Sequence, residues 1–268
     1  MATRITPFVI KRMPGFGSMA AAVFFMLYAP ITLLVVYSFN EKDSLAVWGG
    51  FSLRWYEAAW ANRDIKEAAF RSLWLAGVAA TIATAVATMA AIATTRTRPF
   101  RGITAVYAFI NMPLMVPEIV TAVALLIFFA SIKVATGYTG AIYLVAAHAA
   151  FCIPFAYLPI RARLESMDST LEMAAADLYA SPIEAFKRIT LPLLWPGIMA
   201  GYMLAFVISL DDVVITEHIK SAGMETLPTY MLGQLRREMS PDVNAVSAIF
   251  FGLSVLLVTF FFFLNRKK

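Results

Sequence analysis

Two adjacent aspartates, Asp211 and Asp212, stand near the end of LAFVISLDDVVIT (204–216), a segment otherwise as apolar as a membrane span. A third carboxylate, Glu118, follows the two prolines of MPLMVPE in another long apolar stretch. Carboxylates are costly at membrane depth and normally face the interior of a helix bundle or a water-filled cavity. No lysine or arginine within either stretch is placed to neutralise them, so we expect them to bind a cation.

The heights of these acids along their helices favour one shared site. If the fifth apolar stretch begins on the inner side near Leu193, Asp211 lies ~27 Å along it, and Glu118 lies ~22 Å along the third stretch. A diamine or triamine carries ammonium groups spaced along a chain and would match carboxylates at comparable heights. Neighbouring helix positions point ~100° apart, so Asp211 and Asp212 face one point only if the helix unwinds. The structural alternative is that one aspartate caps a loop helix or reaches outer water.

Other kinds of chemistry lack the residues they need. His148 and His218 lie on different elements and have no recognisable catalytic surroundings, so neither a metal site nor a catalytic site is expected. We expect His148 to hydrogen-bond a neighbouring helix. The net charge of +5 forms no basic stripe with interleaved aromatics, which argues against nucleic-acid binding. The sequence has no glycine-rich phosphate loop, so we expect no enzyme activity and no cofactor in this chain.

Membrane-spanning helices are the elements that must position the acids. The chain is 60% hydrophobic and 15% charged, whereas a soluble domain averages about 45–50% apolar and about 25% charged residues. We expect an all-α membrane protein with six transmembrane helices in a single domain, residues 1–268. The prolines of MPLMVPE predict a break or kink in the third span. Spans of about 20 mostly apolar residues are predicted at 17–39, 70–95, 103–131, 140–160, 193–216 and 243–264.

The distribution of basic residues predicts the orientation of the spans. Lysine and arginine gather in the short turn RTRPFR (96–101) and in the tail RKK (266–268). Because short basic loops mark the cytoplasmic side, both termini and the polar segment 161–192 are expected to be cytoplasmic. The outer loop 51–69 has helical apolar spacing typical of a helix lying at the membrane interface. If Trp55 of this loop folds over the acids, its ring adds a cation–π contact.

The segment 161–192 reads RARLESMDSTLEMAAADLYASPIEAFKRITLP. It is amphipathic and rich in alanine, and it predicts two short helices separated at the Ala-Ser-Pro sequence. Two such helices projecting from a membrane cannot bury an apolar face alone. The segment therefore either docks on a partner or folds back on its own bundle or on the bilayer surface.

The stretch MAAADLYASPIEAFKRITLP resembles the cytoplasmic loop motif of ABC-importer permeases, written EAA, three residues, Gly, nine residues, Ile-x-Leu-Pro. Ala174 and Ala175 match its alanines, and Ile189, Leu191 and Pro192 match its end. In that family the loop docks into a groove of the ATPase subunit and transmits nucleotide-driven closure to the spans. The resemblance implies ATPase coupling by Glu172, Met173, Ala174, Ala175, Asp177, Tyr179, Ile189, Leu191 and Pro192.

The sequence departs from this motif at two positions. The motif glutamate falls on Met173, with Glu172 one residue earlier, and the motif glycine falls on Tyr179. One residue along a helix is a rotation of ~100°, so Glu172 points in a different direction from a motif glutamate. Glycine at such a turn often supplies a positive φ, which tyrosine adopts only at a cost.

Further blocks narrow the resemblance to spermidine/putrescine permeases of the C or I subunit type. These blocks are YAPITLLVVYSFN, FSLRWYE, MPLMVPEIV, HAAFCIPF, SLDDVVIT and SPDVNA, and they extend from about residue 27 to residue 250. The resemblance implies the type I permease fold of ABC importers. It also implies that Trp55, Glu118, Ser209, Asp211 and Asp212 contribute to a path for polyamines. The family often has Asp where this chain has Glu118, which keeps the charge.

The same resemblance implies that the chain lies in the inner (plasma) membrane of a bacterium and works with several partners. They are a second homologous permease, a homodimeric cytoplasmic ATPase that holds ATP and magnesium, a periplasmic or other extracytoplasmic substrate-binding protein, and membrane lipid. The cargo would be putrescine or spermidine. Three alternatives remain: the same machinery importing another small cationic amine, an ion-coupled carrier or channel, or a non-transporting membrane scaffold, which leaves the acids unexplained. The sequence shows no obvious inverted repeat, which argues against a carrier.

Overall fold

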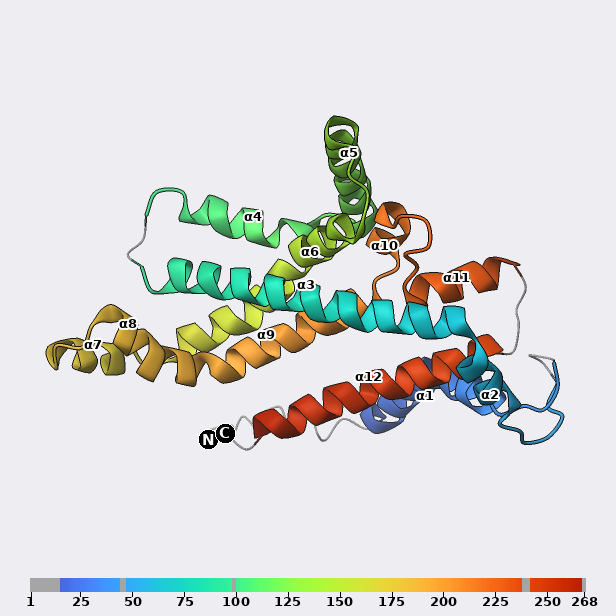
Figure 1. Ribbon diagram of the computed structural model, residues 1–268. Helices are drawn as coiled ribbons and strands as arrows, with labels where there is room; N and C mark the ends of the chain where they lie inside the picture. The colour runs from blue at the N-terminus through green and yellow to red at the C-terminus, as the bar shows by residue number, and fades with distance from the viewer. Residues whose placement is uncertain (1–14, 44–46, 98–99, 238–241, 267–268) are drawn as a thin grey trace, which may run out of the picture. The chain divides into compact units, whose positions relative to one another are not determined.

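The structure, a computed structural model, is almost entirely helical (Figure 1). The chain divides into two compact units, residues 1–61 with 239–251 and residues 62–238 with 252–268. The single permease domain expected from the sequence stays a prediction. The structure describes residues 15–43, 47–97, 100–237 and 242–266.

The first unit contains α1 (Phe16–Tyr37), α2 (Arg54–Ala61) and the beginning of α12 (Asp242–Arg266). The link between α1 and α2 closes on itself through an isolated antiparallel bridge between Asn40 and Phe51. The rings of Phe39 and Phe51 stack across this bridge at 5.3 Å. The helix expected within the loop 51–69 is therefore present as α2.

Three helices form the core of the second unit: α3 (Arg63–Thr95), α6 (Ala141–Ser166) and α9 (Leu191–Asp211). They approach closely because their facing residues are small. On α9, a Cβ added at Gly201 would lie 2.7 Å from the carbonyl oxygen of Ala156 on α6. Cys152 is fully buried here, and its Sγ donates to the Ala205 carbonyl at 3.4 Å. The fully buried alanines of α3 are Ala76, Ala79, Ala80, Ala83, Ala87 and Ala91.

The predicted break in the third apolar stretch is confirmed. It separates α4 (Ile103–Met115) from α5 (Glu118–Thr136), which runs in a clearly different direction in Figure 1. Val116 is extended, with φ −91° and ψ 135°, because the following Pro117 disfavours a helical conformation in the residue before it. The break leaves Glu118 as the first residue of a new helix.

The remaining elements of the second unit lie at the two ends of α6 and α9 (Figure 1). At one end are α7 (Thr170–Asp177), α8 (Pro182–Ala185) and a π-helical turn (Phe186–Thr190) that continues directly into α9. The other end carries α10 (Val214–Ile219), and α11 (Leu227–Arg237) packs on α3. The polar segment 161–192 and the aspartates that end α9 are thus at opposite ends of this unit.

Within the described residues, six helices are long and apolar enough to cross a membrane, as predicted. The third is α5 alone, because the proline break makes α4 too short. The second begins earlier than predicted, since Asn62 caps α3 by accepting from the amides of Asp64 and Ile65. The fifth ends at Asp211, before the predicted end at residue 216. The six are Phe16–Tyr37, Arg63–Thr95, Glu118–Thr136, Ala141–Ser166, Pro182–Asp211 and Asp242–Phe263.

Candidate functional site

The helix unwinds at the two adjacent aspartates. Asp211 is the last residue of α9, Asp212 is extended with φ −63° and ψ 128°, and Val214 begins α10. This change of backbone direction gives the two carboxylates different surroundings. Asp211 is exposed, whereas Asp212 is only 7% exposed.

Asp212 is fixed by the first turn of α10. Its Oδ1 accepts hydrogen bonds from the amide of Thr216 at 2.9 Å and from the Thr216 hydroxyl at 3.0 Å. Its Oδ2 lies 3.4 Å from the amide of Ile215, which also donates to it. Asp212 therefore caps a loop helix, which is the structural alternative raised by the sequence. Capping fixes the carboxylate in place and satisfies amides that the helix leaves unpaired.

His148 connects this cap to the end of α9. Its Nδ1 lies 2.8 Å from Ser209 Oγ, and its Nε2 lies 2.9 Å from Thr216 Oγ1 and 3.6 Å from Asp212 Oδ1. All four residues are buried. The expectation that His148 bonds a neighbouring helix is confirmed. Thr216 was not predicted as part of this site, because the sequence around a single threonine in an apolar run does not indicate which residues it contacts.

Glu118 joins Asp211 and Asp212 in an acid cluster. It begins α5, so its carboxylate lies at a helix N-terminus, where the helix dipole favours negative charge. Its side chain is half-buried and interacts directly with that of Asp212, with Asp211 as a further charged neighbour. Two carboxylates that touch repel each other unless a proton or a cation lies between them. A proton or a cation between the carboxylates would therefore stabilise this arrangement.

Trp55 belongs to the other compact unit. Its indole nitrogen donates to the carbonyl oxygen of Asn40 at 2.8 Å, and the guanidinium of Arg54 lies 4.2 Å from the centre of its ring. The adjacent Tyr56 hydroxyl shares a 2.6 Å hydrogen bond with Ser38. A role for Trp55 in the substrate path stays a prediction.

The segment between α6 and α9 is a two-helix loop, as predicted. At its start, the amide of Thr170 donates to the Asp168 carboxylate at 2.9 Å. This bond, together with the interaction of the Thr170 hydroxyl with the same carboxylate, holds the pKa of Asp168 below its usual value. Ser181 and Glu184 form a reciprocal capping box at the start of α8. The capping box stabilises the start of a short helix that lacks a core of its own, and the bond to Asp168 fixes the turn before α7.

Tyr179 occupies the turn between the two helices of this loop. Its φ is +60°, the only positive value at a non-glycine residue in the described part of the chain. The left-handed turn that we expected where the motif has glycine is therefore present. Tyr179 is 98% exposed, Leu178 is 82% exposed and Met173 is 56% exposed. The loop thus presents an apolar surface that this chain leaves uncovered.

The other residues assigned to coupling divide between the two sides of the loop. Ala174 and Asp177 are exposed, whereas Ala175 is buried within the loop. Glu172 turns inward, toward Arg96 and Thr190. Ile189 and Leu191 are half-buried and Pro192 is exposed, where the π-helical turn meets α9. Pro192 has no amide hydrogen to donate, which weakens the regular helical ladder at this point.

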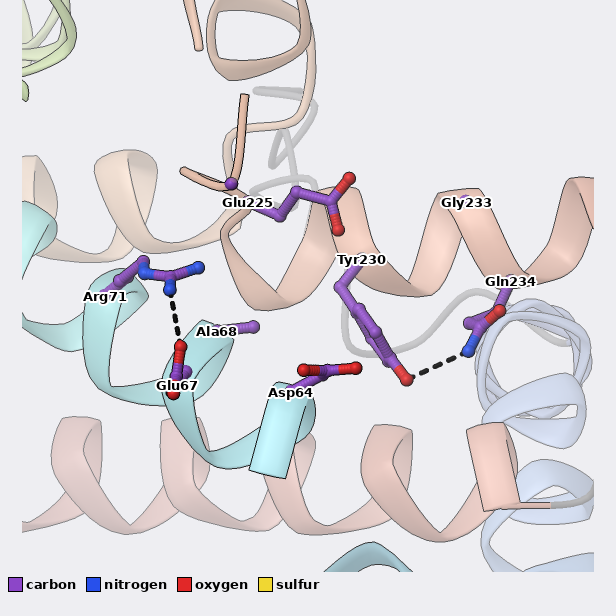
Figure 2. Close-up of a pocket in the computed structure, with 9 residues that line it drawn as sticks. Asp64, Glu67, Ala68, Arg71, Glu225, Tyr230, Gly233 and Gln234 are labelled. Carbon is purple, nitrogen blue, oxygen red and sulfur yellow. Dashed lines mark hydrogen bonds and ion pairs between the residues drawn. The ribbon is translucent and has the colours of Figure 1, made fainter. Parts of the chain in front are cut away.

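A polar pocket of about 350 Å³ lies between the beginning of α3 and α11. Figure 2 shows Asp64 facing Tyr230, and the side-chain amide of Gln234 donates to the Tyr230 hydroxyl at 2.9 Å. Glu67 pairs with Arg71 at 2.7 Å. We did not predict this pocket, because we interpreted 217–242 as a loop; the helical spacing of LPTYMLGQLRR was the available signal.

Comparison with known proteins gives matches over most of the chain. Residues 83–267 match the family described as "Binding-protein-dependent transport system inner membrane component". The chain is 37% identical to the putrescine transport system permease protein PotI of Escherichia coli strain K12, over 85% of this chain and 83% of that protein. It is 38% identical to the spermidine/putrescine transport system permease protein PotC of Haemophilus influenzae, over 92% of this chain and 94% of that protein.

Solved structures show the same fold. A bacterial ABC transporter involved in the import of the acidic polysaccharide alginate aligns with a TM-score of 0.67 at 14% identity, covering 92% of this chain and 93% of that chain. The inward-facing MetNI methionine ABC transporter aligns with a TM-score of 0.61 at 16% identity, covering 75% of this chain and 94% of that chain. The expected type I permease fold of ABC importers is therefore confirmed.

Proposed function

This chain belongs to the family of binding-protein-dependent transport system inner membrane components, and from that membership we propose that it carries polyamines across a bacterial inner membrane. It would be one permease subunit of an ATP-driven importer for putrescine or spermidine. Its resemblance to spermidine/putrescine permeases is confirmed by the PotI and PotC relatives.

The acid cluster is the observation that carries the proposal. Glu118 and Asp212 interact directly, and Asp211 stands beside them with an exposed side chain. An ammonium group between Glu118 and Asp212 relieves their repulsion, and Asp211 takes part in binding a second ammonium further along the same molecule. Ser209, fixed by His148 at 2.8 Å, lies at the end of α9 beside this path. Trp55 contributes from the interface helix α2.

The exposed loop surface supports the proposed partners. Leu178, Tyr179 and Met173 would dock on one subunit of a homodimeric cytoplasmic ATPase, which binds ATP and magnesium. A second permease completes the path, and an extracytoplasmic binding protein delivers the substrate. Both termini of this chain would then be cytoplasmic.

Transport would follow from closure of the ATPase subunits. When ATP closes them, the docked loops of the two permeases move together and the bundle opens away from the cytoplasm. The substrate leaves the binding protein and meets the acid cluster at the opposite end of α9 from the loop. ATP hydrolysis separates the ATPases again and resets the path.

Uptake of labelled putrescine and spermidine tests the proposal. The assembled complex is placed in proteoliposomes with binding protein outside and ATP inside. ATP-dependent accumulation of either polyamine supports the proposed function. Flux without ATP would identify a carrier or channel. ATP hydrolysis stimulated by loaded binding protein, without polyamine uptake, would point to another small cationic amine.

A further inference from the structure

Glu172 connects three helices through one carboxylate. Its Oε2 lies 3.3 Å from the Nε of Arg96, which caps the end of α3, and its Oε1 accepts a hydrogen bond from the Thr190 hydroxyl at 2.8 Å. Thr190 immediately precedes α9. We propose that these three residues form a clasp that positions the loop and makes α3 and α9 move with it. This inference rests on the proposed function.

The clasp is shielded enough to hold its geometry. The side chains of Arg96 and Glu172 are only 20% and 25% exposed, and Thr190 is 5% exposed. Exposed ion pairs contribute little because water screens them; this pair is partly buried, so water screens the attraction between its two charges less. Arg96 also donates to the carbonyl of Met167 at 3.4 Å, just beyond the end of α6. All three core helices therefore meet at this point.

The inward position of Glu172 separates two functions within the loop. Met173, Leu178 and Tyr179 point outward and provide the docking surface. Glu172 points the other way and touches the helices that lead to the substrate path. The loop thus binds its partner with one side and transmits the movement with the other.

One of the helices joined by the clasp, α9, reaches the acid cluster without interruption. α9 runs 21 residues from Leu191 to Asp211, a length of ~32 Å at the usual helical rise. Close-packed helices shift as units rather than deform continuously. A displacement of α7 is therefore expected to arrive at Ser209 and Asp211 as movement of α9.

Two single variants and one charge exchange test the clasp in the assembled complex. Glu172→Gln keeps an oxygen for Thr190 but removes the charge, and Arg96→Gln removes the other half of the pair. The exchange combines Glu172→Arg with Arg96→Glu. The matched control is Glu165→Gln, which breaks an exposed pair with Arg161 on α6.

Uptake per ATP hydrolysed, retention of the ATPase and amide hydrogen exchange in α7 are measured for each complex. Both single variants should lower uptake per ATP roughly fivefold and speed exchange in α7 by roughly the same factor. The ATPase should stay bound. The charge exchange should recover most of both losses, and Glu165→Gln should behave as the unaltered complex.

Two results would overturn the clasp. Glu172→Gln releasing the ATPase while Arg96→Gln changes nothing would make Glu172 a docking contact. Unchanged uptake per ATP and unchanged exchange in both single variants would show that the pair transmits nothing. If the unaltered complex shows no ATP-dependent uptake, the proposed function fails, and exchange in α7 still decides whether the clasp orders the loop.

Discussion

At the scale of single residues, the acid cluster holds its carboxylates in two different ways. Asp212 accepts from two amides and a hydroxyl of the first turn of α10, so its position is set by the fold. Asp211, one residue earlier, ends α9 with an exposed side chain. Asp212 therefore shapes the site, while Asp211 is available to a ligand.

This difference gives a prediction for Asp211→Asn. The variant should lower polyamine uptake at limiting concentration roughly tenfold, or about 1.4 kcal/mol of binding free energy, because one carboxylate of the cluster is lost. Assembly should be unchanged, since the side chain is exposed. Uptake is measured in proteoliposomes and assembly by size-exclusion chromatography, with Glu165→Gln as control. A complex that falls apart would make Asp211 structural.

Removal of His148 should affect stability as well as transport. His148→Ala leaves the hydroxyls of Ser209 and Thr216 without their shared partner and opens a cavity, so we expect a loss of about 2 kcal/mol of unfolding free energy. Thermal unfolding in detergent measures it. Thr216→Val, which keeps the volume and removes the hydroxyl, should cost less. An unchanged melting temperature in His148→Ala would contradict this account.

At the scale of elements, Tyr179 combines a positive φ, which is costly for a residue with a side chain, with an exposed ring that is available for docking. Tyr179→Gly should relieve the cost of a positive φ, by about 1 kcal/mol, and slow hydrogen exchange in the loop. Removing the exposed ring should also weaken ATPase retention. Tyr179→Ala is the matched variant: it loses the ring but keeps the backbone cost. Equal exchange in the glycine and alanine variants would show that the turn stores no strain.

The contact between α6 and α9 depends on the absence of a side chain at Gly201. Gly201→Ala places a Cβ 2.7 Å from the Ala156 carbonyl oxygen, so the helices must separate, at a cost of about 1–3 kcal/mol. The control is Gly252→Ala, where nothing lies within 4 Å of the new Cβ. Thermal unfolding compares the two. A stable Gly201→Ala protein would mean that α9 shifts freely along α6.

The membrane helices could be predicted from the sequence better than the residues at which they end or the side-chain contacts between them. Apolar runs and prolines predicted six membrane helices and the break before Glu118, because both depend on local composition. The predicted end of the fifth span was wrong because Asp212 bonds to Thr216 in the first turn of a new helix, α10, and polar partners inside an apolar run leave no periodic signal. The inward position of Glu172 depends on Arg96, far away in the sequence, and no local pattern reports such a pair.

At the scale of the whole molecule, one membrane helix of the second unit buries little surface. The apolar window of α5 is 6% buried, against 44% and 50% for α3 and α6 of the same unit. Apolar helices gain little from contact with one another beyond packing, since lipid is equally apolar. The poorly buried α5 is therefore available to lipid or to another subunit.

The proposed second permease should accordingly stabilise this chain. The chain purified alone should unfold at a lower temperature than the same chain in the assembled complex, because a partner that binds only the folded state stabilises it. Melting in one detergent, with intrinsic fluorescence of the tryptophans as signal, compares the two. Identical temperatures would indicate that lipid or detergent, not protein, covers α5.

Cys152 is the sole cysteine of the sequence, and it is buried between α6 and α9 with its Sγ bonded to a backbone carbonyl. A thiol reacts as the thiolate, which forms poorly in apolar surroundings that water does not reach. Site-specific labelling of this protein therefore does not require the removal of its own cysteine. A cysteine introduced on α7 would be the residue that a maleimide dye modifies, so the path of the loop through a transport cycle can be followed by single-molecule fluorescence.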